Sequence, residues 1–265
     1  MIPSQRWAAM KQTVFDHVAI GVRTLTDGWQ LFGGLLGGTW VYGGDSPGYW
    51  WGQLGFAAGP KIELLTPTGG PDAAFLERFL NSRGPGPHHL TFVVADLSHT
   101  LSRARELGIE PIAIDLSNDA WKEAFLHPRD AQGIVIQLAQ QSVTPELEPP
   151  AELPEPGPAS AFEPVEHHVT DLSGATKLFT ELLHGEPVTR PGSQAAPVAE
   201  LTWSNGALLR LVGSAAEAAE PSPTPPAVRT HLHFTRVDAQ FSPDECTRAA
   251  DLANRLGICL HLRAT

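Results

Sequence analysis

The sequence predicts an α+β protein built from tandem βαβββ modules whose strands form half-barrel sheets, with a degenerate and truncated second pair of modules. Three observations predict it. β-rich runs alternate with amphipathic segments of helical period. The same order returns after a stretch rich in Pro and Glu. Glycines and prolines separate the runs. We therefore expect a first domain at 1–142, a linker at 143–160 and a degenerate, incomplete second domain at 161–265.

The first module is expected between residues 14 and 65. A β-rich run, VFDHVAIGV, opens it at 14–22, and an amphipathic segment follows at 24–36. That segment runs into Gly37-Gly38, which is typical of a helix C-terminus. Further runs between Gly and Pro turns predict three strands, at 40–42, 49–56 and 61–65. A short helix at 71–80 leads to the second module.

The second module repeats this order. A strand is expected at 88–94 and a helix at 97–107 that Gly108 ends. Three strands follow, at 112–114, 121–126 and 133–138. Beyond them, six prolines interleaved with glutamates predict an extended acidic linker, because proline fits neither a helix interior nor a central strand.

After the linker the pattern begins again. The helix motif Leu178-Phe179 with Leu182-Leu183 repeats Leu31-Phe32 with Leu35-Leu36, and HLHFTRVD at 231–238 repeats HLTFVVAD at 89–96. A second proline-rich stretch, 215–228, predicts a long loop. The last module has room for its helix and about one strand, so its final strands are expected to be missing.

Composition limits the partners. The chain has 265 residues and a formal net charge of -11, which argues against nucleic acid and anionic membrane surfaces. Its two cysteines are too few for a disulfide framework, and neither a signal peptide nor a membrane span is evident. We expect a cytoplasmic protein with a small-molecule substrate, no nucleic-acid or membrane partner, and a homodimer as one allowed state.

Four polar residues stand inside apolar, β-rich runs: His17, Glu63, His89 and Gln137. Inward positions of a curled sheet can converge on one point. Two imidazoles with carboxylate and amide oxygens suit a divalent metal such as Co, Ni, Mn, Fe or Zn. Composition alone leaves the alternative of four unrelated, half-exposed strand residues.

Several motifs occur in order through the first half: DHVA at 16–19, KIELLTP at 61–67, GPHHL at 86–90, FLHP at 125–128 and GIVIQL at 133–138. Together they resemble the vicinal-oxygen-chelate (glyoxalase/bleomycin resistance/dioxygenase) superfamily, and within it the methylmalonyl-CoA epimerases. The resemblance implies that His17, Glu63, His89 and Gln137 occupy the metal-ligand positions, and that Glu63 and Gln137 are the catalytic residues.

The sequence also departs from the epimerase pattern. Gln137 stands where epimerases usually have Glu, and an amide can ligate but cannot exchange protons. The stretch 49–56, where the family supplies an acid/base glutamate, contains no Asp, Glu, His or Lys. We expect four residues to bind substrate: Trp50, Trp51, Gln53 and His127. The alternatives are core packing for the tryptophans and turn formation for His127.

The second half is expected to carry no metal of its own. Glu63 aligns with Arg210, which cannot ligate, and only His89 has a matching histidine, His231. The sequence therefore predicts a metal-dependent enzyme of the glyoxalase/epimerase type. It would act on a small carbonyl-containing metabolite, as an isomerase or lyase, through a metal-stabilised enolate. Two alternatives stay open: a small-molecule or antibiotic binding protein without turnover, and an Fe(II)-dependent dioxygenase.

Overall fold

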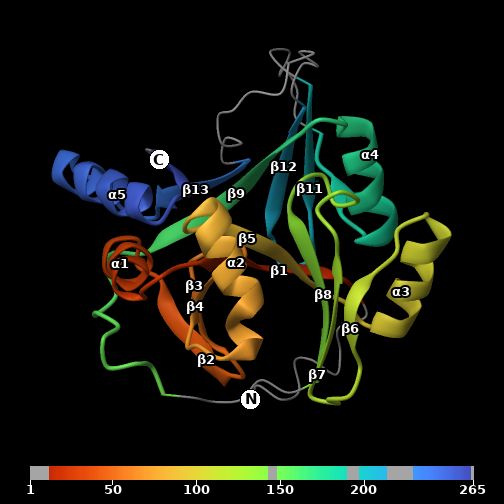
Figure 1. The fold of residues 1–265 in the computed structure, drawn as a ribbon. Coiled ribbons are helices and arrows are strands. Elements are labelled where there is room, and N and C mark those ends of the chain that lie inside the picture. Colours follow the sequence, from red (N-terminus) through yellow and green to blue (C-terminus); the bar gives the residue numbers. More distant parts are fainter. Residues whose placement is uncertain (1–11, 143–147, 190–196, 214–228, 264–265) are drawn as a thin grey trace. The chain divides into compact units, whose positions relative to one another are not determined.

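The computed structural model describes residues 12–142, 148–189, 197–213 and 229–263 (Figure 1). The predicted loop at 215–228 lies outside the described residues. The chain divides into two compact units. The first comprises 1–17, 89–145 and 167–218, and the second comprises 18–88, 146–166 and 219–265. Each unit thus combines residues from both sides of the proline-rich stretch, while the division into domains 1–142 and 161–265 stays a prediction.

The elements follow the predicted module order. The first module contains β1 (Val14–Gly21), α1 (Thr26–Gly28) continued by the π-helical η2 (Trp29–Leu35), β2 (Thr39–Ser46), β3 (Tyr49–Gly55) and β4 (Lys61–Pro67). The 3-10 turn η3 (Pro71–Ala73) and α2 (Ala74–Arg83) connect it to the second module. That module contains β5 (Gly86–Val93), α3 (Leu97–Glu106), β6 (Ile112–Asp115), β7 (Trp121–Leu126) and β8 (Val135–Gln141).

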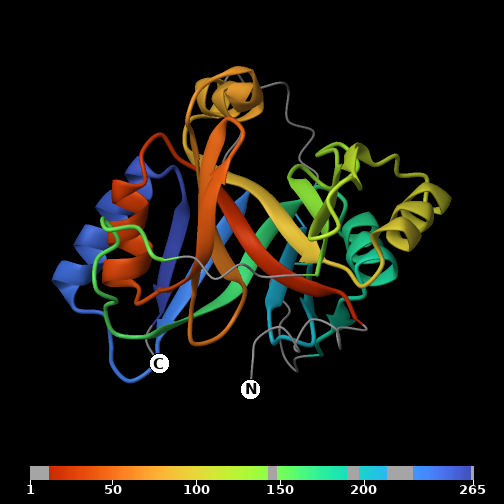
Figure 2. The ribbon, with the colours of Figure 1, turned by 90° about the horizontal axis from the view of Figure 1, so that it is seen from below.

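The second half repeats this order with fewer strands. Its first module contains β9 (Ser160–Val169), α4 (Leu172–Lys177) continued by η4 (Leu178–Leu182), β10 (Glu186–Pro187), β11 (Val198–Thr202) and β12 (Leu208–Gly213). The last described elements are β13 (Thr230–Arg236), α5 (Pro243–Arg255) and β14 (Cys259–Arg263). The fold class is α+β, as predicted, with curled strands that Figure 2 shows from below.

Two helices end in the same way, which supports the internal repeat. Gly108 follows α3 and Gly257 follows α5, with φ of 79° and 61°. Only glycine adopts this left-handed conformation without steric cost. The next residue then donates its N–H back to the helix, Ile109 to the Ala104 oxygen at 2.9 Å and Ile258 to the Ala253 oxygen at 3.0 Å.

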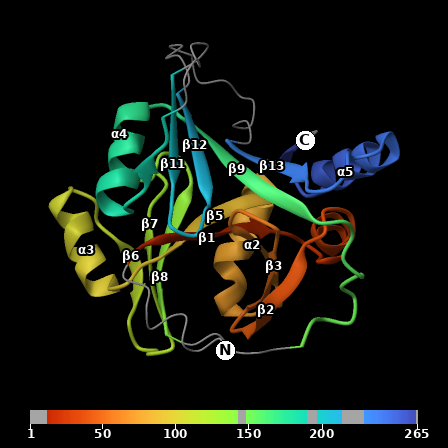
Figure 3. The same ribbon diagram turned by 180° about the vertical axis from the view of Figure 1, so that it is seen from behind.

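The first unit has an aromatic core. Phe15 stacks on Phe92 with ring centroids 4.9 Å apart, and Trp203 contacts both rings. Phe179 of η4 packs on Phe92 from the helix side. The helices α3 and α4 of this unit lie side by side in Figures 1 and 3. This core fixes β1 and β5, the two strands that carry the predicted histidine ligands of the first half.

The second unit has its own core. Phe162 stacks on Phe234 at 4.6 Å, and Phe56 and Phe32 pack against Phe234. The helices α1 and α5 lie side by side and are joined by an ion pair from Arg255 to Asp27 at 3.0 Å (Figure 1).

The described part of the linker packs on this second unit. Residues 148–159 form no helix or strand. Gly157 donates its N–H to the Gly33 oxygen at 3.2 Å. The buried Arg236 donates to the Pro158 oxygen at 3.1 Å. The last part of this stretch is therefore held by a backbone hydrogen bond and by a hydrogen bond from the Arg236 side chain.

The strand pairs β5–β8 and β13–β14 have the same geometry. β8 pairs with β5 in parallel, with His89 opposite Val135 and Thr91 opposite Gln137. β14 likewise pairs with β13 in parallel, with His231 opposite Cys259 and His233 opposite His261. β14 therefore takes the place, beside β13, of the last ligand strand that the sequence analysis expected to be missing.

Candidate metal centre

His17 is a buried histidine oriented by its neighbour in the sequence. All eight residues of β1 are buried, and the His17 side chain is 1% exposed. Its Nδ1 lies 2.7 Å from Oδ2 of Asp16, which is buried as well. A carboxylate that accepts the N–H of one ring nitrogen fixes the tautomer and presents the other nitrogen to a metal. His17 therefore has the arrangement of a metal ligand that binds through Nε2.

His89 lies beside His17 in the first unit. Its side chain is 4% exposed, and the two ring centroids are 5.9 Å apart. The ring of Phe125 from β7 contacts His89 edge-on, with centroids 6.2 Å apart. Two of the four predicted ligands are thus brought together in a buried, partly aromatic environment.

Gln137 uses both ends of its amide. Its Oε1 accepts a hydrogen bond from Thr91 Oγ1 at 2.7 Å, and its Nε2 donates to Glu123 Oε2 at 2.8 Å. These bonds fix which end is the oxygen. A carbonyl oxygen has two lone pairs, so Oε1 retains the capacity to ligate.

Glu123 is a functional candidate that the sequence analysis missed. It lies in β7 and accepts hydrogen bonds from Gln137 and from Trp121 Nε1, each at 2.8 Å. It shares one face of β7 with Phe125, which touches His89. The run WKEAF gives one signal, since alternation places Trp121, Glu123 and Phe125 on one face, but no motif marks Glu123.

Glu63 belongs to the second unit and is 7% exposed in β4. Its Oε2 accepts a hydrogen bond from Nε2 of Gln53, the residue opposite it in β3, at 2.7 Å. The buried Gln53, predicted to bind substrate, therefore orients the carboxylate that the sequence predicts as a ligand.

The two adjacent tryptophans of β3 point to opposite faces of the strand. Trp50 packs edge-on against Trp29 of η2, with centroids 5.8 Å apart, and stacks on Trp40. Trp51 shares the face of Gln53 and packs against Tyr42 at 5.2 Å. Trp50 therefore packs toward the helix, whereas Trp51 lies on the face of the predicted ligand Glu63.

His127 and His88 have other surroundings. His127 is exposed and forms the turn after β7, where its Nδ1 accepts from the Arg129 N–H at 3.1 Å. His88 packs against the rings of Phe75 and Phe79, and burial lowers its pKa to about 4. His88 is therefore neutral near pH 7, in keeping with a packing role beside the predicted ligand His89.

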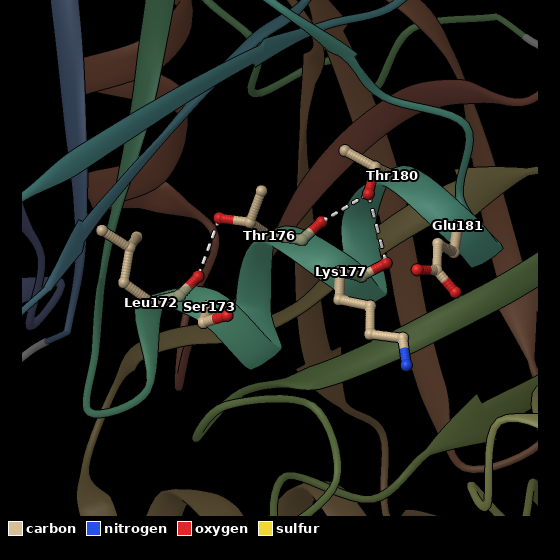
Figure 4. A pocket seen from close by; sticks show the side chains of 6 residues that line it. All are labelled: Leu172, Ser173, Thr176, Lys177, Thr180 and Glu181. Atoms are coloured by element: carbon tan, nitrogen blue, oxygen red, sulfur yellow. Dashed lines mark hydrogen bonds between the residues drawn. The ribbon is translucent and has the colours of Figure 1, made fainter.

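A separate surface hollow lies along α4 and η4 (Figure 4). Six residues line it: Leu172, Ser173, Thr176, Lys177, Thr180 and Glu181. Its threonine hydroxyls donate to helix carbonyls, Thr176 to the Leu172 oxygen at 2.7 Å and Thr180 to the Thr176 oxygen at 2.8 Å. These donors are already engaged by the helix, and none of the predicted site residues lines the hollow.

Residues 16–125 match the family model of the glyoxalase/bleomycin resistance protein/dioxygenase superfamily. This segment of the chain is therefore similar to that superfamily. The predicted resemblance is thereby confirmed, and the matched segment contains His17, Glu63 and His89. Within the described residues, no helix is long and apolar enough to cross a membrane.

Two curated relatives are similar to part of the chain. An uncharacterized protein of Bacillus subtilis, YqjC, is 27% identical over 128 residues, which cover 47% of this chain and 90% of the relative. The ethylmalonyl-CoA/methylmalonyl-CoA epimerase of Cereibacter sphaeroides is 35% identical over 85 residues, which cover 30% of this chain and 61% of the relative.

Solved structures of similar proteins include two at 26% identity. A hypothetical protein from Bacillus halodurans aligns over 52% of this chain and 100% of its own, with a TM-score of 0.45. The methylmalonyl-CoA epimerase of Mycobacterium tuberculosis aligns over 48% of this chain and 87% of its own, with a TM-score of 0.44.

Proposed function

We propose that the chain is a metal-dependent enzyme of the glyoxalase/epimerase type that acts on a small carbonyl-containing metabolite by proton transfer. The observation that carries this proposal is the buried His17–His89 pair, in which the Asp16 carboxylate orients the first ring. Burying two imidazoles and a carboxylate costs free energy unless hydrogen bonds, ion pairing or metal coordination offset the lost hydration. Metal coordination would offset this cost, and the match of residues 16–125 to the superfamily model supports it.

Four residues would hold the metal in this proposal. His17 and His89 supply imidazole nitrogens, Glu63 supplies a carboxylate, and Gln137 supplies its amide oxygen. This donor set suits a divalent ion such as Co, Ni, Mn, Fe or Zn. Bound there, the ion would act as a Lewis acid that stabilises negative charge developing on a substrate carbonyl oxygen.

Glu123 would then move the proton. An amide at position 137 cannot exchange protons, but it donates a hydrogen bond to the Glu123 carboxylate at 2.8 Å. We assign Glu123 the acid/base role, with Gln137 as its positioning partner. In this role the Glu123 carboxylate takes a proton from the carbon next to the substrate carbonyl and returns it.

The substrate class rests on the relatives. The Cereibacter sphaeroides relative is named an epimerase of ethylmalonyl-CoA and methylmalonyl-CoA, so a branched acyl thioester is the first substrate to test. The half-buried Trp51, on the Gln53 face of β3, is the aromatic side chain that we assign to the substrate site.

The test is exchange of the substrate C–H proton with deuterated solvent, with methylmalonyl-CoA as the probe. We expect exchange in the metal-loaded protein and its loss in His17→Ala together with the metal. Glu123→Gln should keep the metal and lower the exchange rate by roughly 10²–10⁴-fold. Glu77→Gln, at an exposed carboxylate of α2, is the matched control.

Three outcomes would contradict the proposal. Exchange that continues after the metal is removed would exclude the metal mechanism. A ligand that binds tightly and is recovered without exchange would favour a binding protein. Oxygen uptake with Fe(II) and substrate would favour a dioxygenase.

A further inference from the structure

Three side chains of the types that bind metals lie close together where β13 pairs with β14. His231 lies opposite Cys259, and His233 lies opposite His261. Alternation along a strand therefore places Cys259 and His261 on one face of β14 and His231 on the same face of β13. The ligand atoms of His231, Cys259 and His261 all lie within 4.8 Å of one another. The sequence analysis did not single out this group.

A carboxylate from β9 joins the cluster. Glu166 Oε1 lies 3.5 Å from Nδ1 of His231. Burial raises the pKa of the Cys259 thiol, and the negative charge of Glu166 raises it further. Two imidazoles and one thiol of the second unit therefore lie together, and the Glu166 carboxylate reaches the cluster at His231.

Three of the separations between these ligand atoms fit a tetrahedral zinc site. Zn–N bonds of about 2.1 Å and Zn–S bonds of about 2.3 Å place neighbouring ligand atoms roughly 3.4–3.6 Å apart. Nε2 of His261 lies 3.2 Å from Nδ1 of His231 and 3.5 Å from Sγ of Cys259. The Glu166–His231 distance of 3.5 Å fits as well.

The position of the cluster follows from the module repeat. His231 matches His89, and His261 stands in β14 where Gln137 stands in β8, two residues beyond the partner of the matched histidine. The sequence predicts a second half without metal, because Arg210 replaces the carboxylate ligand and no last ligand strand is expected there. The pairing of β14 with β13 supplies that strand.

We propose that His231, Cys259, His261 and Glu166 form a second metal site that binds Zn²⁺. Its four protein ligands close the coordination sphere, which is the pattern of structural zinc sites. The ion would join β9, β13 and β14. On binding, the S–H bond of Cys259 breaks, its proton passes to solvent and the thiolate bonds to zinc.

Co²⁺ is the probe for this site, because a cobalt–thiolate bond gives a sulfur-to-metal charge-transfer band in the near ultraviolet. We expect this band when the full chain is titrated with Co²⁺ and its disappearance when Zn²⁺ is added. Cys259→Ser should abolish the band and weaken Zn²⁺ binding at this site by at least the roughly 10–100-fold that losing an outer-shell partner causes. His261→Ala should weaken binding in the same way.

Cys246→Ser is the matched control, because Cys246 is an exposed free thiol on α5. It should leave the band unchanged. His17→Ala should also leave it unchanged, since the proposed site of the first half contains no sulfur, so the two proposals can fail separately. As a second measurement, Zn²⁺ should protect Cys259 from alkylation and leave Cys246 reactive.

The proposal is overturned if Co²⁺ gives no sulfur band, if the band survives Cys259→Ser, or if Zn²⁺ leaves the alkylation rate of Cys259 unchanged. The alkylation measurement uses the unsubstituted chain, so a substitution that impairs folding cannot obscure the result.

Discussion

Replacing Asp16 by Asn tests the orientation of His17 directly. Asp16 Oδ2 lies 2.7 Å from His17 Nδ1, and the two side chains are 7% and 1% exposed. Asn keeps the size and a carbonyl acceptor but removes the negative charge that makes the imidazole a stronger ligand. Loss of such an outer-shell carboxylate reduces metal affinity by roughly 10–100-fold, or about 1.4–2.7 kcal/mol. We expect the lower end of this range for Asp16→Asn and the upper end for Asp16→Ala.

The assay is competition between the protein and a chelator of known affinity for Co²⁺ or Zn²⁺, in a combined Cys259→Ser and His261→Ala background that lacks two ligands of the proposed second site. Asp45→Asn is the control, because Asp45 is an exposed carboxylate of β2. An affinity of Asp16→Asn equal to that of Asp45→Asn would refute the reasoning, since it would show that Asp16 orients no metal ligand.

Three further predictions concern charge. Gln137→Glu places a carboxylate against Glu123, so the metal-free protein should lose about 1–3 kcal/mol of unfolding free energy at pH 7 and regain it when Glu123→Gln is added. Glu245→Ala removes the carboxylate 2.7 Å from the buried Arg236 and a helix-capping group, and urea unfolding should show a loss of roughly 2–4 kcal/mol. The pKa of His88 is lowered to about 4 from 6.5, so the unfolded chain binds more protons between these values. Unfolding free energy should therefore fall by up to about 3 kcal/mol as pH drops from 6.5 to 4, and His88→Leu should remove that dependence.

Local signals were enough to predict most of the fold. The glycines after α3 and α5 end helices wherever they occur, and the repeated Leu-Phe motifs of η2 and η4 mark the same element in both halves. The strand expected at 40–42 instead runs from Thr39 to Ser46. Its glycines and aspartate favour a turn locally, but pairing with β3 along this length, with an irregularity at Tyr42, holds them in the sheet.

The candidate sites were predictable in part. His17 and His89 stand out as polar residues in apolar runs, and the structure brings their rings together. Glu123 could not be singled out in this way, because its importance comes from Gln137 on the neighbouring strand. The second cluster depends on the parallel register of β13 and β14, which joins Cys259 to a histidine 28 positions earlier in the sequence, His231. No local pattern encodes that register.

The proposed function requires that His17 and His89 bind a metal in the first half of the chain. Metal analysis of the purified, zinc- or cobalt-loaded protein with Cys259→Ser and His261→Ala combined tests this requirement most directly, because the second proposed site then lacks two of its ligands. We predict one bound ion per chain, and none after His17→Ala and His89→Ala are combined. An unchanged metal content in the combined variant would contradict the claim.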